Sequence, residues 1–518
     1  MEQKQQLLLE QGAGRFWNWL RPYRWAFFGA LICGLLAHMF AFTNKLVNHD
    51  EVQCLFSKGA TVDSGRWGLG ALDSILPNFS MPWIYGIMTI VLIALAVCLM
   101  ADLFSIRSKL LQVLLGGCVL SFPSLTGTFG YMFTSSAYGI AFLLAVLAVW
   151  LLCRKNWLGT VLGLGAMVLS LSIYQAYIAV AASLLVLVLI QRLLEEDKTA
   201  LVFRQGVWFV GFLVVSLGVY YVGTQLVLKI TGTSFNSYAG ENVAFHLADL
   251  PGKILLAYKT FAGMFLWGAF GVMPTTGFLK LMYLALGLAA AAMGLLWMFR
   301  KKREPMALVL LVVLCALLPL AINCMFLFTT EEAIHTLVVY SVIGVYLLTL
   351  VLVQALLPET VSQKAAEWLR RCGMNVATLA LAGILAGNVY LANIAYLNMH
   401  LRYENAYSFY TTVLTAAQQV PGYEKETPLA VIGNWQRPQF YEEKFEVLVN
   451  LGGVTGFLPD EYSAPSFVQY YLGASIPFAT EQEKAQLQST PSFQQMPVYP
   501  ANGSIAMIDG CLVVKLSQ

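Results

Sequence analysis

The stretch at residues 82–101, PWIYGIMTIVLIALAVCLMA, decides the fold, because its twenty residues contain no charged side chain. At a rise of 1.5 Å per residue, a helix of this length spans the ~30 Å hydrocarbon core of a bilayer. Over the whole 518-residue chain, 58% of the residues are hydrophobic and 11% are charged, whereas a soluble globular protein has about 25% charged residues. The sequence therefore predicts a polytopic α-helical membrane protein.

Apolar stretches of similar length recur along the chain, and we count about eleven transmembrane helices. The shortest are 108–123 and 157–173. A further apolar stretch at 254–273 is interpreted as a re-entrant or interfacial helix rather than a full crossing. The eleven predicted spans are residues 25–44, 82–101, 108–123, 134–152, 157–173, 176–193, 206–228, 280–299, 306–325, 335–356 and 374–396.

The lysines and arginines predict the orientation, because loops on the cytoplasmic side of a membrane carry an excess of them. With the N-terminus inside, the inner segments carry 18 of these cations, and the two longer outer loops, 45–81 and 229–280, carry seven. The three short outer turns near 123–134, 173–176 and 326–335 carry none. The expected location is therefore a cell membrane, with a cytoplasmic N-terminus.

An odd number of spans places the C-terminal tail outside. The predicted organisation is a transmembrane catalytic domain at 1–396, followed by a small extracytoplasmic α/β domain at 397–518. The polarity of this tail is that of an ordinary soluble domain. Its predicted secondary structure is a helix at 403–419, a strand at 429–433 and a hairpin at 504–516 that turns at Asp509-Gly510.

Composition and motifs disfavour several classes of function. The net charge is +3 and no basic tract occurs, so nucleic acid is not an expected partner. The nine cysteines are scattered without a CxxC pair or Cys/His cluster, so no metal or redox site is expected. Nucleotide-binding and hydrolase motifs are missing as well, and no cofactor is evident. The lack of an internal repeat argues against a transporter built from inverted halves.

The stretch at 46–53, LVNHDEVQ, places His49, Asp50 and Glu51 just beyond the first apolar run. A straight helix from Trp25 reaches position 50 after about 37 Å, at the depth of the outer lipid phosphates. A carboxylate beside an apolar interface and a second negative charge has a raised pKa, which suits a base that removes a proton from a sugar hydroxyl. Adjacent residues on a helix diverge by about 100°, so both acids meet one atom only if the helix bends. The alternative is an ordinary polar helix end.

The following loop, SKGATVDSGRWGLGALDSILP at 57–77, combines four glycines with Arg66 and Trp67. Arginine grips phosphate oxygens with a planar fork, and tryptophan can stack on the apolar face of a sugar. Both residues are therefore candidate substrate-binding groups. The alternatives are a snorkelling cation and an interfacial anchor.

A second acidic pair, Glu331-Glu332, lies on the same predicted outer side. His335 follows Glu331 at i, i+4, a spacing that puts both side chains on one face of a helix. These three residues are candidates for substrate binding. The alternative is a helix N-terminus, where threonine caps and glutamates stabilise the positive end of the dipole.

Two further candidates come from other outer segments. Tyr174 and Gln175 lie at the turn between two spans, where they line an acceptor pocket or belong to the interfacial aromatic belt. Lys259, in the second outer loop, neutralises a lipid-linked phosphate or anchors its segment at the interface.

Taken together, this layout resembles the GT-C superfamily of integral membrane glycosyltransferases. More narrowly, NHDEVQ and SGRWGL within 48–69 resemble the glucosyltransferase family that includes bacterial serotype-converting enzymes. The C-terminal MIDGCLVVKL is also similar to tails in that family. Such enzymes take a sugar, typically glucose, from a polyprenyl-phosphate carrier and place it on a cell-envelope polysaccharide outside the membrane, with inversion at the anomeric carbon.

The resemblance implies specific roles. Asp50 is the expected base, Glu51 its partner, and Arg66 the ligand of the donor phosphate or the residue that positions the loop. Some relatives in the superfamily use a divalent cation. The rival functions are a transporter or flippase of lipid-linked saccharides, which needs ionisable groups buried within the spans, and a polymerase or ligase, which relies on outer-loop arginine and histidine.

Overall fold

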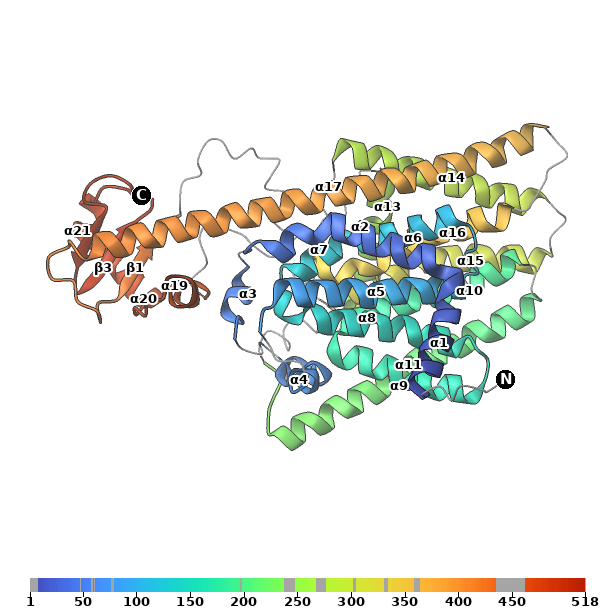
Figure 1. The fold of residues 1–518 in the computed structure, drawn as a ribbon, viewed down its shortest axis with the longest axis horizontal. Helices are drawn as coiled ribbons and strands as arrows, with labels where there is room; N and C mark the ends of the chain where they lie inside the picture. Colours follow the sequence, from blue (N-terminus) through green and yellow to red (C-terminus); the bar gives the residue numbers. More distant parts are fainter. Residues whose placement is uncertain are drawn as a thin grey trace, which may run out of the picture.

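The structure is a computed structural model that describes residues 8–46, 48–56, 59, 61–75, 79–195, 198–236, 247–266, 276–300, 304–329, 334–357, 364–434 and 462–517. A bundle of long helices makes up most of the molecule, and a small domain stands at one end of it (Figure 1). We call that end of the bundle the domain end, and the opposite one the far end.

Within these residues, nine helical stretches are long and apolar enough to cross a membrane, so the chain is a polytopic α-helical membrane protein. They contain α2 (Arg24–Thr43), α5 (Pro82–Leu103), α8 (Met132–Leu152), α10 (Ile178–Leu194), α11 (Thr199–Thr231), α14 (Gly277–Arg300), α15 (Pro305–Ile322), α16 (Ile343–Leu356) and α17 (Lys364–Ala417).

Two predicted spans have a different form. The stretch predicted at 108–123 is a pair of helices, α6 (Lys109–Leu120) and α7 (Pro123–Phe129), that meet at a bend of 45°. The turn predicted near 123–134 is thus partly helical, because Pro123 begins a new helix at its first position. The stretch at 157–173 is the shorter apolar helix α9 (Trp157–Ile173). Every predicted span coincides with a helix, while the number of complete crossings stays a prediction.

The remaining elements are short. One of them, α13 (Leu250–Leu266), covers the described part of the apolar segment that was interpreted as re-entrant or interfacial. These elements are α1 (Leu8–Leu20), η1 (Arg21–Tyr23), α3 (His49–Gln53), η2 (Val62–Ser64), α4 (Trp67–Asp73), η3 (Gln175–Tyr177), η4 (Leu247–Asp249), α13 (Leu250–Leu266), η5 (Cys324–Leu327), η6 (Thr336–Val342), α19 (Ala464–Leu472), α20 (Glu481–Gln488) and α21 (Pro491–Gln495).

The small domain contains a three-stranded sheet in the order β1-β3-β2. Strand β1 (Leu429–Ile432) pairs in parallel with β3 (Cys511–Lys515), and β2 (Ile505–Ile508) pairs with β3 in an antiparallel hairpin. Asp509 and Gly510 form the hairpin turn with φ of 45° and 79°, as a two-residue turn of this type requires. The strand and hairpin predicted from the sequence are confirmed.

The helix α17 continues from the bundle into the small domain. It runs without interruption from Lys364 to Ala417, past the boundary predicted between residues 396 and 397 (Figure 1). Its final turns bury Phe409 and Tyr410 in the core of the domain. The bundle and the domain are therefore joined by a rigid helix rather than by a linker.

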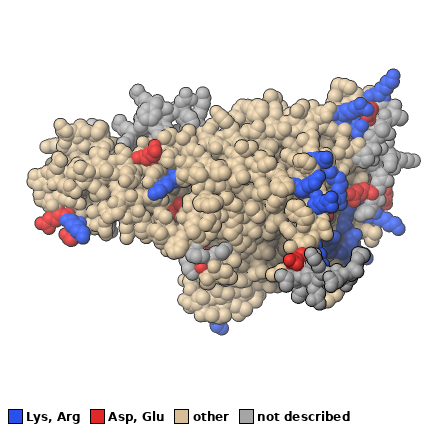
Figure 2. Space-filling view, in the orientation of Figure 1, with Lys and Arg blue, Asp and Glu red and all other residues tan. Residues whose placement is uncertain are grey.

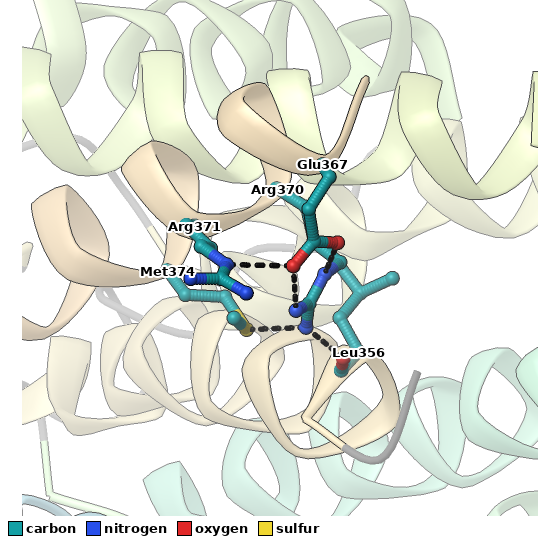
Figure 3. A network of polar contacts seen from close by, with 5 residues as sticks. All are labelled: Leu356, Glu367, Arg370, Arg371 and Met374. Atoms are coloured by element: carbon teal, nitrogen blue, oxygen red, sulfur yellow. Dashed lines mark hydrogen bonds and ion pairs between the residues drawn. The ribbon is translucent and has the colours of Figure 1, made fainter. Parts of the chain in front are cut away.

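At its far end, α17 carries a buried ion pair whose arginine also binds the end of α16 (Figure 3). Arg370 donates from Nη2 and Nε to the two carboxylate oxygens of Glu367, at 2.7 and 2.8 Å. Its Nη1 donates to the carbonyl of Leu356, near the C-terminus of α16, at 2.7 Å. Arg371 also donates to Glu367, at 2.6 Å, but its side chain is 71% exposed.

Replacing Glu367 by glutamine is expected to lower the free energy of unfolding by about 3 kcal/mol, because Arg370 then keeps a buried charge without a carboxylate partner. The Arg371→Gln control is expected to cost less than about 1 kcal/mol, because that pair is exposed to solvent. SDS titration of the purified protein measures both. Equal losses in the two variants would contradict the assignment of Arg370 as the buried partner.

Candidate active site

The helix α3, which carries the first acidic pair, is separate from the first span. The predicted position of Asp50, on a straight continuation of that span, is wrong: α2 ends at Thr43, and Asn44 is extended. Asn48 then caps a new helix, because its side-chain oxygen accepts hydrogen bonds from the backbone N–H groups of Asp50, at 3.0 Å, and Glu51, at 3.4 Å. Both acids therefore lie in the first turn of α3, at the positive end of its dipole.

Glu51 points into the protein and is 7% exposed. Ser80 Oγ donates to its Oε1, and the backbone N–H of Phe133, in the first turn of α8, donates to its Oε2 at 3.2 Å. Burial raises the pKa of Glu51 to about 7, and the negative charge of Asp50 adds to this rise, while the hydrogen bonds from Ser80 and α8 oppose it. Glu51 is thus a carboxyl group that changes protonation near neutral pH.

The raised pKa of Glu51 predicts a pH-dependent stability. The pKa in the folded state, about 7, exceeds the ordinary value of 4.5, so the protonated form stabilises the fold below pH 4.5 and this contribution is lost as pH rises through 7. The difference in unfolding free energy between wild type and Glu51→Gln is expected to change by up to about 3 kcal/mol over this range. SDS titrations at pH 5 and pH 8 measure it, and a constant difference would contradict the prediction.

Asp50 points in another direction, and its side chain is 41% exposed. The Nε2 atom of His49 lies 3.8 Å from Asp50 Oδ2. The ring of His49 stands edge-on to the ring of Tyr131, with centroids 6.3 Å apart. The two adjacent acids thus have different environments, and Asp50 is the one that an external hydroxyl group can reach.

The other side of α3 packs against the small domain. Val52 is fully buried in the core of that domain together with Phe467 of α19. Ser466, also in α19, donates a hydrogen bond to the side-chain carbonyl of Gln53. Burial raises the pKa of the neighbouring Tyr471, and the charge of Glu51 raises it further. The helix α3 therefore lies between α8 of the bundle and α19 of the domain. The contact between α3 and α19 was not predicted from the sequence.

Arg66 lies on a pair of aromatic rings. Its Nη1 donates to the hydroxyl of Tyr138 in α8 at 3.4 Å. Its guanidinium carbon lies 5.6 Å from the centre of the Tyr174 ring, which stacks on Tyr138 with centroids 4.3 Å apart. Gly65, just before it, adopts φ of 74°, a conformation that glycine allows. The stacked tyrosines hold the planar cation in a fixed orientation.

The other residues predicted around this loop anchor it to the bundle. Gln175 donates from Nε2 to the carbonyl of Ser64 at 3.1 Å. Trp67 donates from Nε1 to Thr224 Oγ1 of α11 at 3.2 Å. The predicted substrate contacts of Tyr174, Gln175 and Trp67 stay predictions. In the structure, these three residues position Arg66 and its loop.

One helix supports both parts of the site. Glu51 binds the backbone of Phe133, and Arg66 binds the side chain of Tyr138, five residues further along α8. Five residues span about 7.5 Å along a helix axis. The acidic pair and the arginine are thus built on the first two turns of α8, at the domain end of the bundle.

The remaining predicted site residues lie on other elements or outside the described ranges. Lys259 is exposed on α13, which packs against α14, α15 and η5. His335 is exposed at the N-terminus of η6, which packs against α7. Glu331 and Glu332 lie outside the residues that the structure describes. Over the part of the chain that is described, no three His, Cys, Asp or Glu residues are grouped as metal ligands.

An apolar groove with a volume of about 510 Å³ lies between α10, α11 and α15. Its lining includes Leu185 of α10, Leu213 of α11 and Leu314 of α15, and it is almost entirely hydrocarbon. Such a groove between transmembrane helices is suited to an aliphatic chain.

The fold and the site define a polytopic membrane protein that carries a half-exposed carboxylate, a buried carboxyl group and a stacked arginine at one end of its helix bundle. A family model described as "Glucosyl transferase GtrII" matches residues 39–408. The chain therefore belongs to the GtrII glucosyl transferase family, and it is a membrane glycosyltransferase. No individually curated protein and no solved structure matches the chain significantly.

Proposed function

We propose that the protein transfers glucose from polyprenyl-phosphate glucose to a cell-envelope polysaccharide on the outer face of the membrane, with Asp50 as the catalytic base. The observation that carries this proposal is the difference in exposure and hydrogen bonding between Asp50 and Glu51. Asp50 is half-exposed, whereas Glu51 is buried and bound by Ser80 and the start of α8. The membership of the GtrII family supports the choice of glucose.

The reaction is a single displacement. Asp50 accepts the proton of an acceptor hydroxyl, and the oxygen attacks the anomeric carbon of glucose from the face opposite the phosphate. The bond between that carbon and the phosphate oxygen breaks, and polyprenyl phosphate leaves with the electron pair, so the anomeric configuration inverts. Glu51, with a pKa of about 7, spends part of its time neutral at physiological pH, which limits the repulsion of the phosphate by paired negative charges.

Arg66 is the proposed ligand of the donor phosphate, because a fixed guanidinium binds phosphate oxygens in a bidentate manner. The groove between α10, α11 and α15 supports a lipid-linked donor. Leu213 of the groove and Tyr220 lie on the same face of α11, seven residues or about 10 Å apart. Tyr220 donates to the carbonyl of Gly65, next to Arg66, at 3.1 Å. A polyprenyl tail in the groove would therefore place its phosphate near Arg66.

The distribution of charge supports the proposed orientation. Figure 2 shows Lys and Arg side chains gathered at the far end of the bundle, opposite the small domain. Just beyond the C-termini of α5 and α8 lie Arg107, which donates to Tyr23 at 2.9 Å, and Arg154, which pairs with Asp102 at 3.0 Å. By the excess of cations on the cytoplasmic side, the far end faces the cytoplasm of a bacterial cell and the small domain lies outside.

Transport of lipid-linked saccharides is the main alternative. Transporters and flippases place ionisable groups within their spans. In the described ranges, the buried Asp, Glu, Lys and Arg side chains lie at the ends of the bundle or in the small domain, which favours an enzyme. They are Glu51, Arg370, Arg402, Lys484 and Lys515. His38, buried within α2, is bonded on both ring nitrogens, to the Tyr396 hydroxyl and the Leu120 carbonyl. A polymerase or ligase, which relies on outer-loop arginine and histidine, is less favoured, because the acidic pair Asp50-Glu51 is held by α8 and by Ser80.

The test is glucosyl transfer by the purified protein in liposomes. Radiolabelled polyprenyl-phosphate glucose is mixed with envelope polysaccharide, and label in the polysaccharide and its anomeric linkage are measured. Inverted transfer from this donor, and none from UDP-glucose, is expected. Transfer from UDP-glucose alone, or retention of configuration, would contradict the proposal. Parallel assays with EDTA or added Mg²⁺ determine whether a divalent cation assists the leaving phosphate.

A further inference from the structure

We propose that Phe56, Phe79 and Tyr470 form a binding surface for a pyranose ring of the acceptor polysaccharide, which we call the aromatic platform. This inference rests on the proposed function and assigns the acceptor side of the same site. It also gives the small domain, which lies mostly beyond residues 39–408 of the family match, a part in acceptor recognition.

The platform is a contiguous set of exposed rings from three separate segments. Phe56, Phe79 and Tyr470 are 60%, 47% and 40% exposed, respectively. The ring of Phe56 stands edge-on to both neighbours, with centroids 6.0 Å from Phe79 and 5.2 Å from Tyr470. Contiguous exposed apolar surface on a folded protein is characteristic of interaction and ligand-binding sites. The three rings are brought together only by the packing of α3, the start of α5 and α19.

Each of the three segments that contribute a ring to the platform also contributes to the acidic site or to its surroundings. Phe56 follows the end of α3 by three residues. Phe79 precedes Ser80, whose hydroxyl binds Glu51. Tyr470 precedes Tyr471, whose pKa is raised by burial and, to a smaller extent, by the nearby charge of Glu51. Each ring of the platform is thus next to, or within three residues of, a group that contacts Glu51 or belongs to α3.

The chemistry of the platform fits a sugar better than a lipid. One face of a pyranose presents C–H groups that pack on an aromatic ring, and its hydroxyls find the half-exposed Asp50 and the Tyr470 hydroxyl. An aromatic residue that anchors in the bilayer is expected on the outside of the bundle, as is Trp83 at the start of α5, which is 62% exposed. Tyr470 instead belongs to the small domain. The structure thus offers Trp83 as a matched control for membrane anchoring.

The experiment is a titration of full-length protein, in nanodiscs of phosphatidylethanolamine and phosphatidylglycerol, with delipidated envelope polysaccharide from the source cells. Calorimetry without donor reports binding independently of catalysis. Phe56→Ala combined with Tyr470→Ala is expected to weaken binding at least about tenfold, because two stacking contacts are lost. The ring-preserving pair Phe56→Tyr and Tyr470→Phe, and Trp83→Ala, are expected to bind as wild type does. In the transfer assay, the alanine pair is expected to raise the acceptor KM with little change in kcat.

Three outcomes would overturn the platform: a wild type that does not bind the polysaccharide, unchanged binding by the alanine pair, and an equal loss in Trp83→Ala, which would make the rings a membrane anchor. Binding by wild type that is lost in the alanine pair, without any transfer of glucose, would support the platform and reject the proposed reaction. Unchanged melting temperatures of all variants exclude unfolding as the cause.

Discussion

Replacing Asp50 by asparagine is expected to lower the rate of glucosyl transfer by about 10²–10⁴-fold, the usual contribution of a positioned general base. Asparagine keeps the size of the side chain but cannot accept the proton of the acceptor hydroxyl. Because the Asp50 side chain is 41% exposed, the protein is expected to stay folded, and the loss should appear in kcat rather than in the donor KM. Initial rates with radiolabelled polyprenyl-phosphate glucose measure the effect.

Asp63 offers a control within the same loop. Its carboxylate accepts a hydrogen bond from Asn236 at 3.3 Å, so Asp63→Asn is expected to leave transfer close to the wild-type rate. Glu51→Gln is expected to have a smaller effect than Asp50→Asn. Full activity of Asp50→Asn together with loss of activity in Glu51→Gln would transfer the role of base to Glu51.

Replacing Gly68 by valine is expected to lower transfer by about 10²-fold, while the bundle stays intact. At this position α4 lies directly on α9, and a Cβ atom on Gly68 would lie 2.1 Å from Oγ and 2.9 Å from Cβ of Ser172. The helix α4 must then move away, which displaces the adjacent Arg66 and Trp67. A shift of about 1 Å in a group that positions substrate can cost this much in rate.

Gly70, in the same helix, is the matched control. A Cβ atom there would lie 3.4 Å from the nearest atom, Thr61 Oγ1, which is an ordinary contact that small movements accommodate. Gly70→Ala is therefore expected to retain activity. Transfer rates are compared at equal amounts of folded protein, determined by gel filtration. Full activity of Gly68→Val would show that close packing of α4 is unnecessary for the reaction.

The helices and the final hairpin were predictable from the sequence because their signals are local. Uncharged apolar stretches of about twenty residues specify spans, and Asp509-Gly510 between two apolar strands specifies a tight turn. The break between α2 and α3 was not predicted. Its signal was also local, since Asn48 followed by two acids is a helix start, but the apolar run before it favoured a continuous helix.

The candidate site was predictable in part. Asp50, Glu51 and Arg66 come from one loop, so their proximity follows from the sequence, whereas the burial of Glu51 beside the half-exposed Asp50 depends on the packing of α8. The contact between α3 and α19 joins Gln53 to Ser466. No periodicity or spacing in one sequence reports a contact over that separation, and the exposed rings of the aromatic platform were hidden for the same reason.

The continuous helix α17 has a geometric consequence. Its 54 residues measure about 81 Å, more than twice the thickness of a hydrocarbon core. The length of this helix sets the distance of the small domain from the lipid. Its helical phase sets the rotation of the domain about the helix axis. Each added residue would rotate the domain by about 100° about the axis of α17 and move it 1.5 Å along that axis. The contact between α19 and α3 therefore depends on the length and helical phase of α17.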